Sequence, residues 1–399
     1  MRRQPARRPF LLPLCLAGVV VSGCSTAGSG GPAEGGEGET QQTLAAESAA
    51  AGSSGFVVEE VDQFAEPWAM AFLPGSEDLL VTERSGELHL RPADGGERIP
   101  VEGVPEVVHE GQGGLGDVLP GPDFAQDQVV YLSWVEAGDG GTGAVVGRAR
   151  LVQDGGSAAL EDLEVIWQQT PKVDGTGHFS HRLALDPDGE HLFVSSGDRQ
   201  QMDPAQDTSN TLGTVVRLTL DGEAAPGNPL EDEGGVTAQI WSWGHRNPLG
   251  LEFGPDGTLW SSEMGPEGGD ELNVVEAGGN YGWPEVSDGN HYDGGEIPDH
   301  AEGDGFVAPV TSWVPSISPG SLLIYSGEMF PQWQGDALLG ALSGQALVRV
   351  DLEDGQAQGS ETFDLGQRIR AVEQGPDGAV WLLEDAGSGR LLRLTPEEA

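Results

Sequence analysis

The fold is decided by the stretch Leu183-Ala184-Leu185-Asp186-Pro187-Asp188-Gly189, which is followed after two residues by Leu192-Phe193-Val194. Pro presets φ for a turn, Asp can hydrogen-bond back to the backbone, and Gly takes a positive φ without a Cβ clash. Two short apolar runs joined by such a turn predict a pair of antiparallel strands.

This module recurs along the chain, with a divergent fifth copy. The six copies begin near Ala69, Gly114, Leu183, Leu249, Leu322 and Ile369. No long apolar stripe has a helical period, and the 63 glycines would weaken helices. We therefore predict an all-β chain, a six-bladed β-propeller of four-stranded antiparallel blades around a central channel. A β-sandwich is the alternative, and six similar modules favour radial repetition. Residues 56–58 and 391–394 are expected to share a blade, which would hide the sheet edges.

The N-terminus has the pattern of an export signal. Four arginines, at positions 2, 3, 7 and 8, precede an apolar run over 10–21 that is too short for a comfortable membrane span. The run ends in Val21-Ser22-Gly23-Cys24, which resembles a bacterial lipobox, where a peptidase cuts before a lipidated cysteine. The alternative is an ordinary signal peptide, and both general secretion and twin-arginine export fit.

These features divide the chain into three parts. We expect a lipoprotein signal peptide at 1–23, a flexible Gly/Ser/Ala/Glu tether at 24–55 and a catalytic propeller at 56–399. The mature protein would lie on the extracytoplasmic face of the cell membrane, held by lipid on Cys24. Since the only other cysteine is Cys15, inside the signal, no disulfide is expected.

The charge balance is strongly acidic. Asp and Glu number 65 against 19 Lys and Arg, giving a formal net charge of −46. Phosphate backbones would be repelled, so a nucleic-acid partner is excluded.

Polar clusters stand immediately before the strands of four modules. They occupy residues 111–115, 177–182, 244–248 and 368–370, and the last three of them contain His or Arg. Because each precedes the first strand of its module, all are expected to open at one end of the channel. This concentration of cationic side chains in an acidic chain indicates an anion-binding pocket.

Three motifs carry a family resemblance. Gly-His-Arg-Asn-Pro at 244–248, the acidic and glycine-rich run at 263–273, and Asn-Tyr-Gly-Trp-Pro at 280–284 resemble the soluble PQQ-dependent glucose and aldose sugar dehydrogenases. Further matches occur at 67–68, 205–207 and 227–229. The resemblance runs from about residue 56 to 396, and motif order and spacing fit the aldose sugar dehydrogenase branch best.

The resemblance implies PQQ as cofactor, a quinone with three carboxylates. Arg368 and Arg370 match the pair that contacts these carboxylates, and strand alternation would place both on one side. Arg246 and Asn247 match residues that face the quinone edge, where Arg246 would stabilise developing negative charge. The further polar contacts that the resemblance implies are Gln112 and Ser316.

His178 matches the general base of the family, which takes the proton of the anomeric hydroxyl. His181, in the same loop, is the rival. The match favours His178 because it lies four residues before Arg182.

The resemblance also implies calcium. One ion at PQQ would be held by the main-chain carbonyls of Gly265 and Pro266. A second, structural ion is implied at Glu271 and Tyr281, with Asp270 nearby. The alternative for the second ion is that the acidic run only caps a turn.

The chain departs from the family's glucose enzyme at several positions. A lysine beside a PQQ carboxylate corresponds to Ser343, and the aromatic residue that shields the sugar falls near Val314. Gly177 replaces an acid before the base, and Arg199 replaces a glutamine. Cofactor affinity and sugar preference are therefore the properties most open to change.

The function expected from these residues is oxidation of aldoses at the anomeric carbon to lactones. Hydride would pass to PQQ and electrons to a quinone or cytochrome. Two alternatives stay open. One is a calcium-dependent lactonase or esterase propeller, against which the Arg368/Arg370 pair argues. The other is a non-catalytic propeller that binds a surface glycan or protein.

Overall fold

The computed structural model describes residues 47–48 and 55–397. The predicted signal peptide and nearly all of the predicted tether, including Cys24, lie outside the described residues, so both stay predictions. Within this described part, the one α-helix is α1 (Phe124–Asp127), and the short 3₁₀ turns are η1 (Asp203–Gln206), η2 (Glu231–Glu233), η3 (Thr237–Gln239) and η4 (Pro331–Trp333). No helix among these residues has the length and apolar character needed to span a membrane.

The strands of the described residues form five sheets, which confirms the all-β prediction. The first is eight-stranded and joins β3 (Pro67–Phe72), β4 (Leu79–Glu83), β5 (Glu87–Arg91) and β6 (Ile99–Glu102) to β7 (Leu115–Pro120), β8 (Val129–Gly138), β9 (Gly141–Asp154) and β10 (Ser157–Gln168). Its two halves are antiparallel meanders that meet where β6 pairs in parallel with β10.

Two four-stranded antiparallel sheets follow. They contain β11 (Ser180–Leu185), β12 (His191–Ser196), β13 (Thr214–Thr219) and β14 (Ile240–Trp243), then β15 (Pro248–Phe253), β16 (Leu259–Glu263), β17 (Asp270–Val274) and β18 (Thr311–Trp313). The fourth sheet contains β19 (Pro319–Ile324), β20 (Ala337–Ala341), β21 (Ala346–Glu353) and β22 (Gln356–Asp364), with β1 (Glu47–Ser48) added in parallel to β22.

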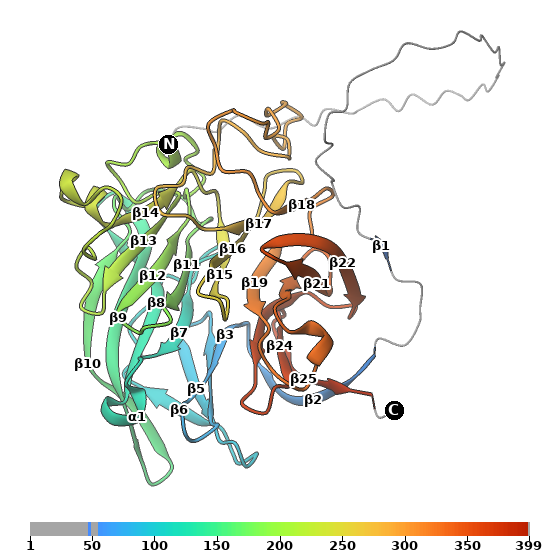
Figure 1. Cartoon of the computed structure of the whole chain (residues 1–399). Coiled ribbons are helices and arrows are strands. Elements are labelled where there is room, and N and C mark those ends of the chain that lie inside the picture. Colours follow the sequence, from blue (N-terminus) through green and yellow to red (C-terminus); the bar gives the residue numbers. More distant parts are fainter. Residues whose placement is uncertain (1–46, 49–54, 398–399) are drawn as a thin grey trace, which may run out of the picture. The chain divides into compact units, whose positions relative to one another are not determined.

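The last sheet pairs the two ends of the domain. It contains β23 (Ile369–Gln374), β24 (Val380–Glu384), β25 (Gly389–Pro396) and β2 (Phe56–Phe64). β2 runs antiparallel to β25 from the pair Phe56 and Pro396 to the pair Phe64 and Gly389, and the blue and red strands lie side by side in Figure 1. The predicted pairing of the two ends in one sheet is therefore confirmed.

The first strands of the modules are neighbours in space. β3, β7, β11, β15, β19 and β23 each lie beside the next, and β23 lies beside β3. Each of these inner strands has a register shift close to its first residue. Hydroxyls on the second strands tie one strand group to the next: Thr82 donates to the Gly116 carbonyl at 2.7 Å and Ser195 to the Pro248 carbonyl at 3.0 Å.

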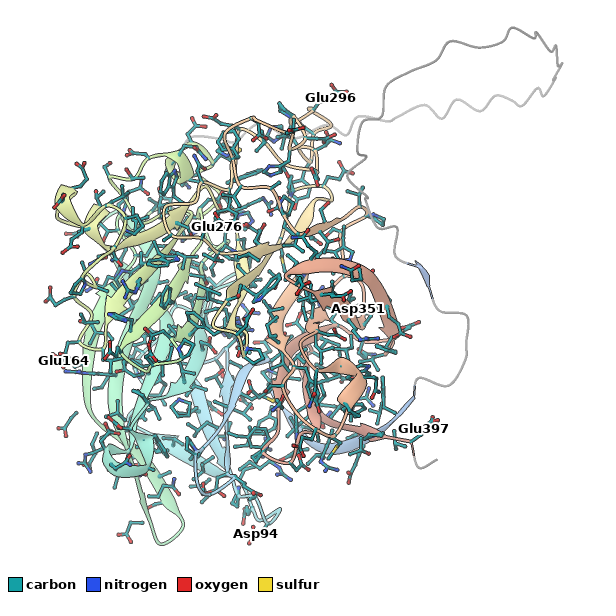
Figure 2. All side chains as sticks on the ribbon, viewed as in Figure 1. Asp94, Glu164, Glu276, Glu296, Asp351 and Glu397 are labelled. Carbon is teal, nitrogen blue, oxygen red and sulfur yellow. The ribbon has the colours of Figure 1, made fainter. Side chains whose placement is uncertain are left out.

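Apolar side chains fill the space between neighbouring sheets, and carboxylates cover the outside. Leu80, Leu132 and Trp134 belong to one buried cluster between the first two strand groups. Each such side chain stabilises the fold by about 1.5–3 kcal/mol. Figure 2 labels six of the acidic side chains, all of them exposed: Asp94, Glu164, Glu276, Glu296, Asp351 and Glu397. Because like charges are spread over the surface, their mutual repulsion stays moderate.

Candidate active site

A cavity of about 290 Å³ opens at the N-terminal ends of the inner strands. Its lining includes Trp68, Arg84, Gln112, Leu249, Met264, Arg368, Arg370 and Asp385. Three guanidinium groups against one carboxylate make the lining positive within an acidic protein. The apolar and aromatic members provide flat surfaces, so the cavity suits a planar anion such as the three-carboxylate quinone PQQ. The polar loops before the strands do meet at this end, as expected.

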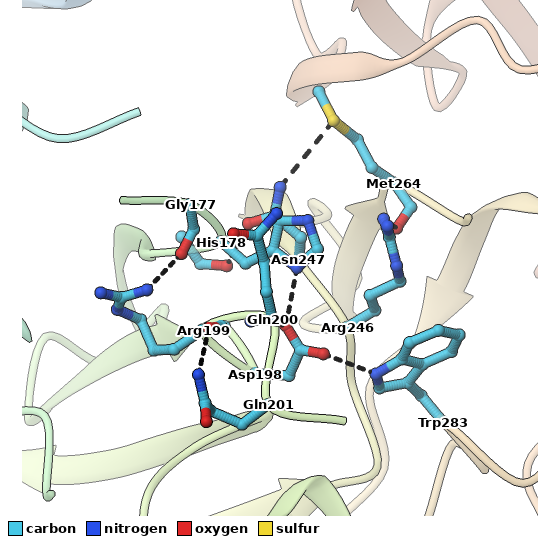
Figure 3. Close-up of polar contacts among 12 residues, drawn as sticks. Gly177, His178, Asp198, Arg199, Gln200, Gln201, Arg246, Asn247, Met264 and Trp283 are labelled. Carbon is cyan, nitrogen blue, oxygen red and sulfur yellow. Dashed lines mark hydrogen bonds and ion pairs between the residues drawn. The ribbon is translucent and has the colours of Figure 1, made fainter. Parts of the chain in front are cut away.

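His178 lies next to this cavity and is held by Asp198 and Gln112. Its Nδ1 is 2.7 Å from Asp198 Oδ1, and its backbone N–H donates to Gln112 Oε1 at 2.6 Å. The other carboxylate oxygen of Asp198 accepts from Trp283 Nε1 at 2.7 Å, which fixes Asp198 in turn (Figure 3). Since Asp198 receives the Nδ1 proton, Nε2 is left as the basic nitrogen.

The electrostatics keep His178 neutral and Asp198 charged. Burial lowers the pKa of His178, the contact with Asp198 raises it, and the charges of Arg246 and Arg199 lower it, so the resulting pKa lies below the usual histidine value. Burial raises the pKa of Asp198, but the hydrogen bond and charge of His178, with donors from Gln200 and Trp283, bring this pKa below its usual value. A neutral imidazole oriented by a carboxylate can accept a proton near neutral pH.

His181, the rival base, is engaged differently. Its ring stacks on Trp68 at 5.0 Å between centroids and 7° between planes, and its Nδ1 lies 2.8 Å from Ser133 Oγ. Burial and the charge of Arg182 lower the pKa of His181 to about 3. These contacts give His181 a packing role and favour His178 as the base.

Arg246 is buried beside His178. Its backbone N–H donates to Glu263 Oε2 at 2.7 Å, and its Nη1 donates to the carbonyls of Met264 at 2.9 Å and Gly265 at 2.5 Å. The guanidinium lies between two aromatic rings, 5.2 Å from Trp283 and 5.8 Å from Tyr292. Its Nε is buried without a hydrogen-bond partner, so a donor is free for a bound group. Figure 3 shows Arg246 in the same cluster as His178.

Asn247 follows Arg246 and is also buried. Its Oδ1 accepts from Ser180 Oγ at 3.1 Å, and its Nδ2 lies 3.8 Å from the sulfur of Met264. A weak sulfur acceptor leaves most of the amide's donor capacity available.

Arg368 and Arg370 converge on one carboxylate. Arg368 Nε donates to Asp385 Oδ2 at 2.7 Å, and Arg370 Nη2 donates to Oδ1 at 3.0 Å. Burial raises the pKa of Asp385, but the charges and hydrogen bonds of both arginines bring it below its usual value. The two guanidinium groups therefore lie on the same side of the chain, as the sequence predicts, and each binds a different oxygen of Asp385.

Ser316 is not among the residues that line the cavity. Its hydroxyl donates to Asp270 Oδ2 at 2.7 Å, whereas Ser318 lines the cavity. Ser343, at the family's lysine position, has its hydroxyl oxygen 3.1 Å from the Ser316 carbonyl oxygen and 2.9 Å from Ser318 Oγ. Of these three serines, Ser318 is thus the one placed to meet a ligand directly.

The residues proposed for calcium lie near one another. Gly265, Glu271 and Tyr281 line a small cavity of about 10 Å³, together with Glu263. Burial and the charge of Glu263 raise the pKa of Glu271 well above its usual value. Asn273 Oδ1 is buried there without a hydrogen-bond partner, and so is each ring nitrogen of His300, whose Nε2 is 3.9 Å from Glu271. Crowded carboxylates and an orphaned oxygen fit a hard cation.

The three other residues predicted to bind calcium would have to do so through the main chain. The hydroxyl of Tyr281 is used up between the Val274 carbonyl and the Glu276 N–H, so Tyr281 could offer only its carbonyl. The Gly265 carbonyl already accepts from Arg246, and Pro266 follows it directly. A Cβ at Gly265 would lie 2.2 Å from the Gly269 carbonyl oxygen, so only glycine allows this close approach of backbone.

Arg182 fills the channel below the cavity. It stacks over Trp68 of β3 at 3.9 Å and pairs with Asp117 of β7 at 3.3 Å. Its Nε donates to the Leu249 carbonyl of β15 at 2.8 Å, and Nη2 donates to the Gly320 carbonyl of β19 at 2.8 Å and the Arg370 carbonyl of β23 at 3.5 Å. With its own strand β11, one guanidinium contacts all the inner strands.

Sequence reasoning missed several of these residues. It gave no role to Asp198 or Asp385, and it missed the cavity-lining Arg84. Arg199, noted as a departure, is fully buried: it stacks on Phe179 at 3.7 Å and donates to the Gly175 carbonyl at 2.8 Å, which supports the loop before His178. The adjacent charged residues Asp198 and Arg199, directly after a predicted strand, were the sequence feature that could have indicated a functional role.

Comparison with known proteins identifies the family. The glucose/sorbosone dehydrogenase model matches residues 64–393. Aldose sugar dehydrogenase YliI of Escherichia coli is 41% identical over 342 residues, 84% of this chain and 91% of its own. The crystal structure of the soluble E. coli aldose sugar dehydrogenase in the apo-form has a TM-score of 0.81 at 39% identity, covering 86% of this chain and 100% of the other. The PQQ-bound aldose sugar dehydrogenase of Streptomyces coelicolor has a TM-score of 0.72 at 28% identity, covering 86% and 98%. The chain therefore belongs to the glucose/sorbosone dehydrogenase family.

Proposed function

We propose that this protein is a PQQ- and calcium-dependent sugar dehydrogenase that oxidises aldoses at the anomeric carbon to lactones. The observation that carries the proposal is the neutral His178, oriented by the buried charge of Asp198, beside a cavity lined by arginines. The PQQ-bound relative and the aldose sugar dehydrogenase relatives support it.

The side chains have distinct roles in this proposal. His178 Nε2 takes the proton of the anomeric hydroxyl while Asp198 stabilises the imidazolium that forms. Arg368 and Arg370 bind carboxylates of the cofactor, and the Arg246 guanidinium and Asn247 amide face the negative charge that develops. PQQ, when bound, supplies the two-electron acceptor for the hydride of the anomeric carbon. The proposed external electron acceptor is a quinone or cytochrome.

Calcium completes the proposed site. The carbonyls of Gly265 and Pro266 would hold the ion that accompanies PQQ, and Glu271 with the carbonyl of Tyr281 would hold a structural ion. Calcium would supply Lewis-acid polarisation at the first position and would relieve the repulsion between Glu263 and Glu271 at the second.

We also propose that the strand groups are six propeller blades. The ring of inner strands, the shared register shift and the contacts of Arg182 support this count, because each feature occurs once per group. Export as a lipoprotein anchored through Cys24 on the extracytoplasmic face is proposed from the sequence alone.

One experiment tests the proposed activity. The purified chain, stripped of metal, is supplied with PQQ and calcium, and reduction of an artificial dye is followed with several aldoses. Dye reduction that requires both additions supports the proposal. Absence of reduction, together with no absorbance change from bound PQQ, would exclude it. Lactone hydrolysis without PQQ would instead indicate the lactonase alternative.

A further inference from the structure

A second cluster of possible metal ligands lies outside the cavity, on the hairpin of β4 and β5. Glu83 ends β4, Glu87 begins β5, and His89 is two residues further. His89 Nε2 is 3.4 Å from Glu83 Oε1 and 3.4 Å from Glu87 Oε2. The three ligand atoms all lie within 4.8 Å of one another, and no other such group of at least three occurs in the described part of the chain.

His89 differs from the histidines that form a hydrogen bond with a carboxylate. The pairs of His178 with Asp198 and His191 with Asp186 are 2.7 Å long, and His245 lies 3.1 Å from Glu263. These are hydrogen-bond distances. His89 Nε2 is instead equidistant from two carboxylates, shielded from solvent, and without a hydrogen-bond partner.

The two distances from His89 Nε2 to the carboxylate oxygens match the edges of a tetrahedral metal site. Zinc binds imidazole nitrogen at about 2.0–2.1 Å and carboxylate oxygen at about 2.0–2.2 Å, and at a tetrahedral angle these bonds separate N and O by about 3.4 Å. A nitrogen donor with two carboxylates disfavours Ca²⁺ and Mg²⁺, which prefer oxygen. Glu87 is 67% exposed, so water has access to a fourth position.

We propose that Glu83, Glu87 and His89 bind one Zn²⁺ ion. Glu83 Oε1 also accepts the Ala65 N–H at 2.8 Å, which orients the buried carboxylate toward the site. The bound ion cross-links β4 and β5, the two strands of the hairpin. It lies next in sequence to Arg84, which lines the cofactor cavity, and it is independent of the proposed dehydrogenase chemistry.

The test measures zinc on the full chain. Protein stripped with a chelator and restored with excess calcium is titrated with Zn²⁺ by calorimetry, and bound metal is counted by mass spectrometry. We expect one tight equivalent. His89→Gln and the more exposed Glu87→Gln should each weaken binding by at least about tenfold. The matched control is His109→Gln, because His109 Nε2 contacts a single carboxylate, Glu66 Oε2, at 2.8 Å; it should leave binding unchanged.

Two further measurements make the outcome decisive. Co²⁺ in place of Zn²⁺ should give the visible absorption of a tetrahedral site in wild type and not in Glu87→Gln. Zn²⁺ should raise the thermal midpoint of wild type and of His109→Gln only. Equal zinc affinity in wild type, His89→Gln and Glu87→Gln would overturn the assignment, and so would the absence of a tight equivalent in wild type.

Discussion

Replacing Asp198 by Asn tests the orientation of the proposed base. Asp198 is fully buried and accepts three hydrogen bonds, from His178 Nδ1 at 2.7 Å, Trp283 Nε1 at 2.7 Å and the Gln200 N–H at 2.8 Å. An amide removes the charge and can present its NH₂ group to Nδ1. The imidazole would then carry its proton on Nε2, the nitrogen that must accept the proton of the sugar.

The expected size of the effect follows from one charge-assisted hydrogen bond. Such a bond contributes about 1.5–3 kcal/mol, which equals roughly 1–2 pKa units at 1.36 kcal/mol per unit. The base must be unprotonated to act, so kcat/KM rises with pH through the pKa of His178. Since Asp198 raises this pKa, the Asn variant should move the rising limb about 1–2 units to lower pH. The wrong tautomer should also lower the plateau rate by about 10²–10⁴.

The assay is dye reduction with PQQ, calcium and an aldose between pH 4 and 9. Asp186→Asn is the matched control, since Asp186 pairs with His191 at the same 2.7 Å but lies outside the cavity, and its rate should stay at the wild-type value. Thermal midpoints of both variants separate misfolding from loss of the base. An Asp198→Asn plateau within about threefold of wild type, with an unmoved limb, would refute the role of His178.

Three further predictions address the cofactor and stability. Arg370→Gln removes one guanidinium from the cavity and should weaken PQQ binding about tenfold to a hundredfold, measured by titrating the apo chain; a change below twofold would contradict the carboxylate role. Ser343→Lys restores the charge implied by the family at the exposed position beside Ser318 and should tighten PQQ binding severalfold in the same titration. His181 stays neutral with a pKa of about 3 against an unfolded value near 6.5, so the unfolded chain binds a proton that the folded chain does not. The free energy of unfolding should therefore fall as pH drops from 6.5 toward 3, by up to about 1.4 kcal/mol per pH unit from this group. Denaturant titrations at several pH values check this, because the unfolding free energy of His181→Gln should depend less steeply on pH, by the equivalent of up to one bound proton.

The sequence predicts the strands better than it predicts their contacts. Turn residues such as Pro187-Asp188-Gly189 act locally, so the hairpin of β11 and β12 could be located from a short window. The pairing of β2 with β25 was also predictable, because two leftover apolar runs at the ends needed partners.

The partners of the site residues could not be predicted in this way. Asp385 lies 15 residues from Arg370 and meets it across a hairpin, while Trp283 lies 85 residues from Asp198. Such contacts depend on how several strand groups turn toward the channel, and no local pattern reports that. Ser316 shows the same limit. The family resemblance predicts that Ser316 contacts the cofactor, yet its hydroxyl donates to the Asp270 carboxylate, and Ser318 lines the cavity instead.

The position of Arg182 has a kinetic consequence. A second cavity of about 480 Å³, lined by Glu252 and Glu373, occupies the opposite ends of the inner strands, and Arg182 stands between it and the cofactor cavity. A through passage along the channel is therefore closed by a guanidinium bonded on several sides. In the proposed reaction, the sugar and the electron acceptor must therefore both enter through the opening of the cofactor cavity, one after the other. Initial-rate plots against sugar at several acceptor concentrations should then be parallel lines, the mark of an enzyme that releases its first product before it meets its second substrate.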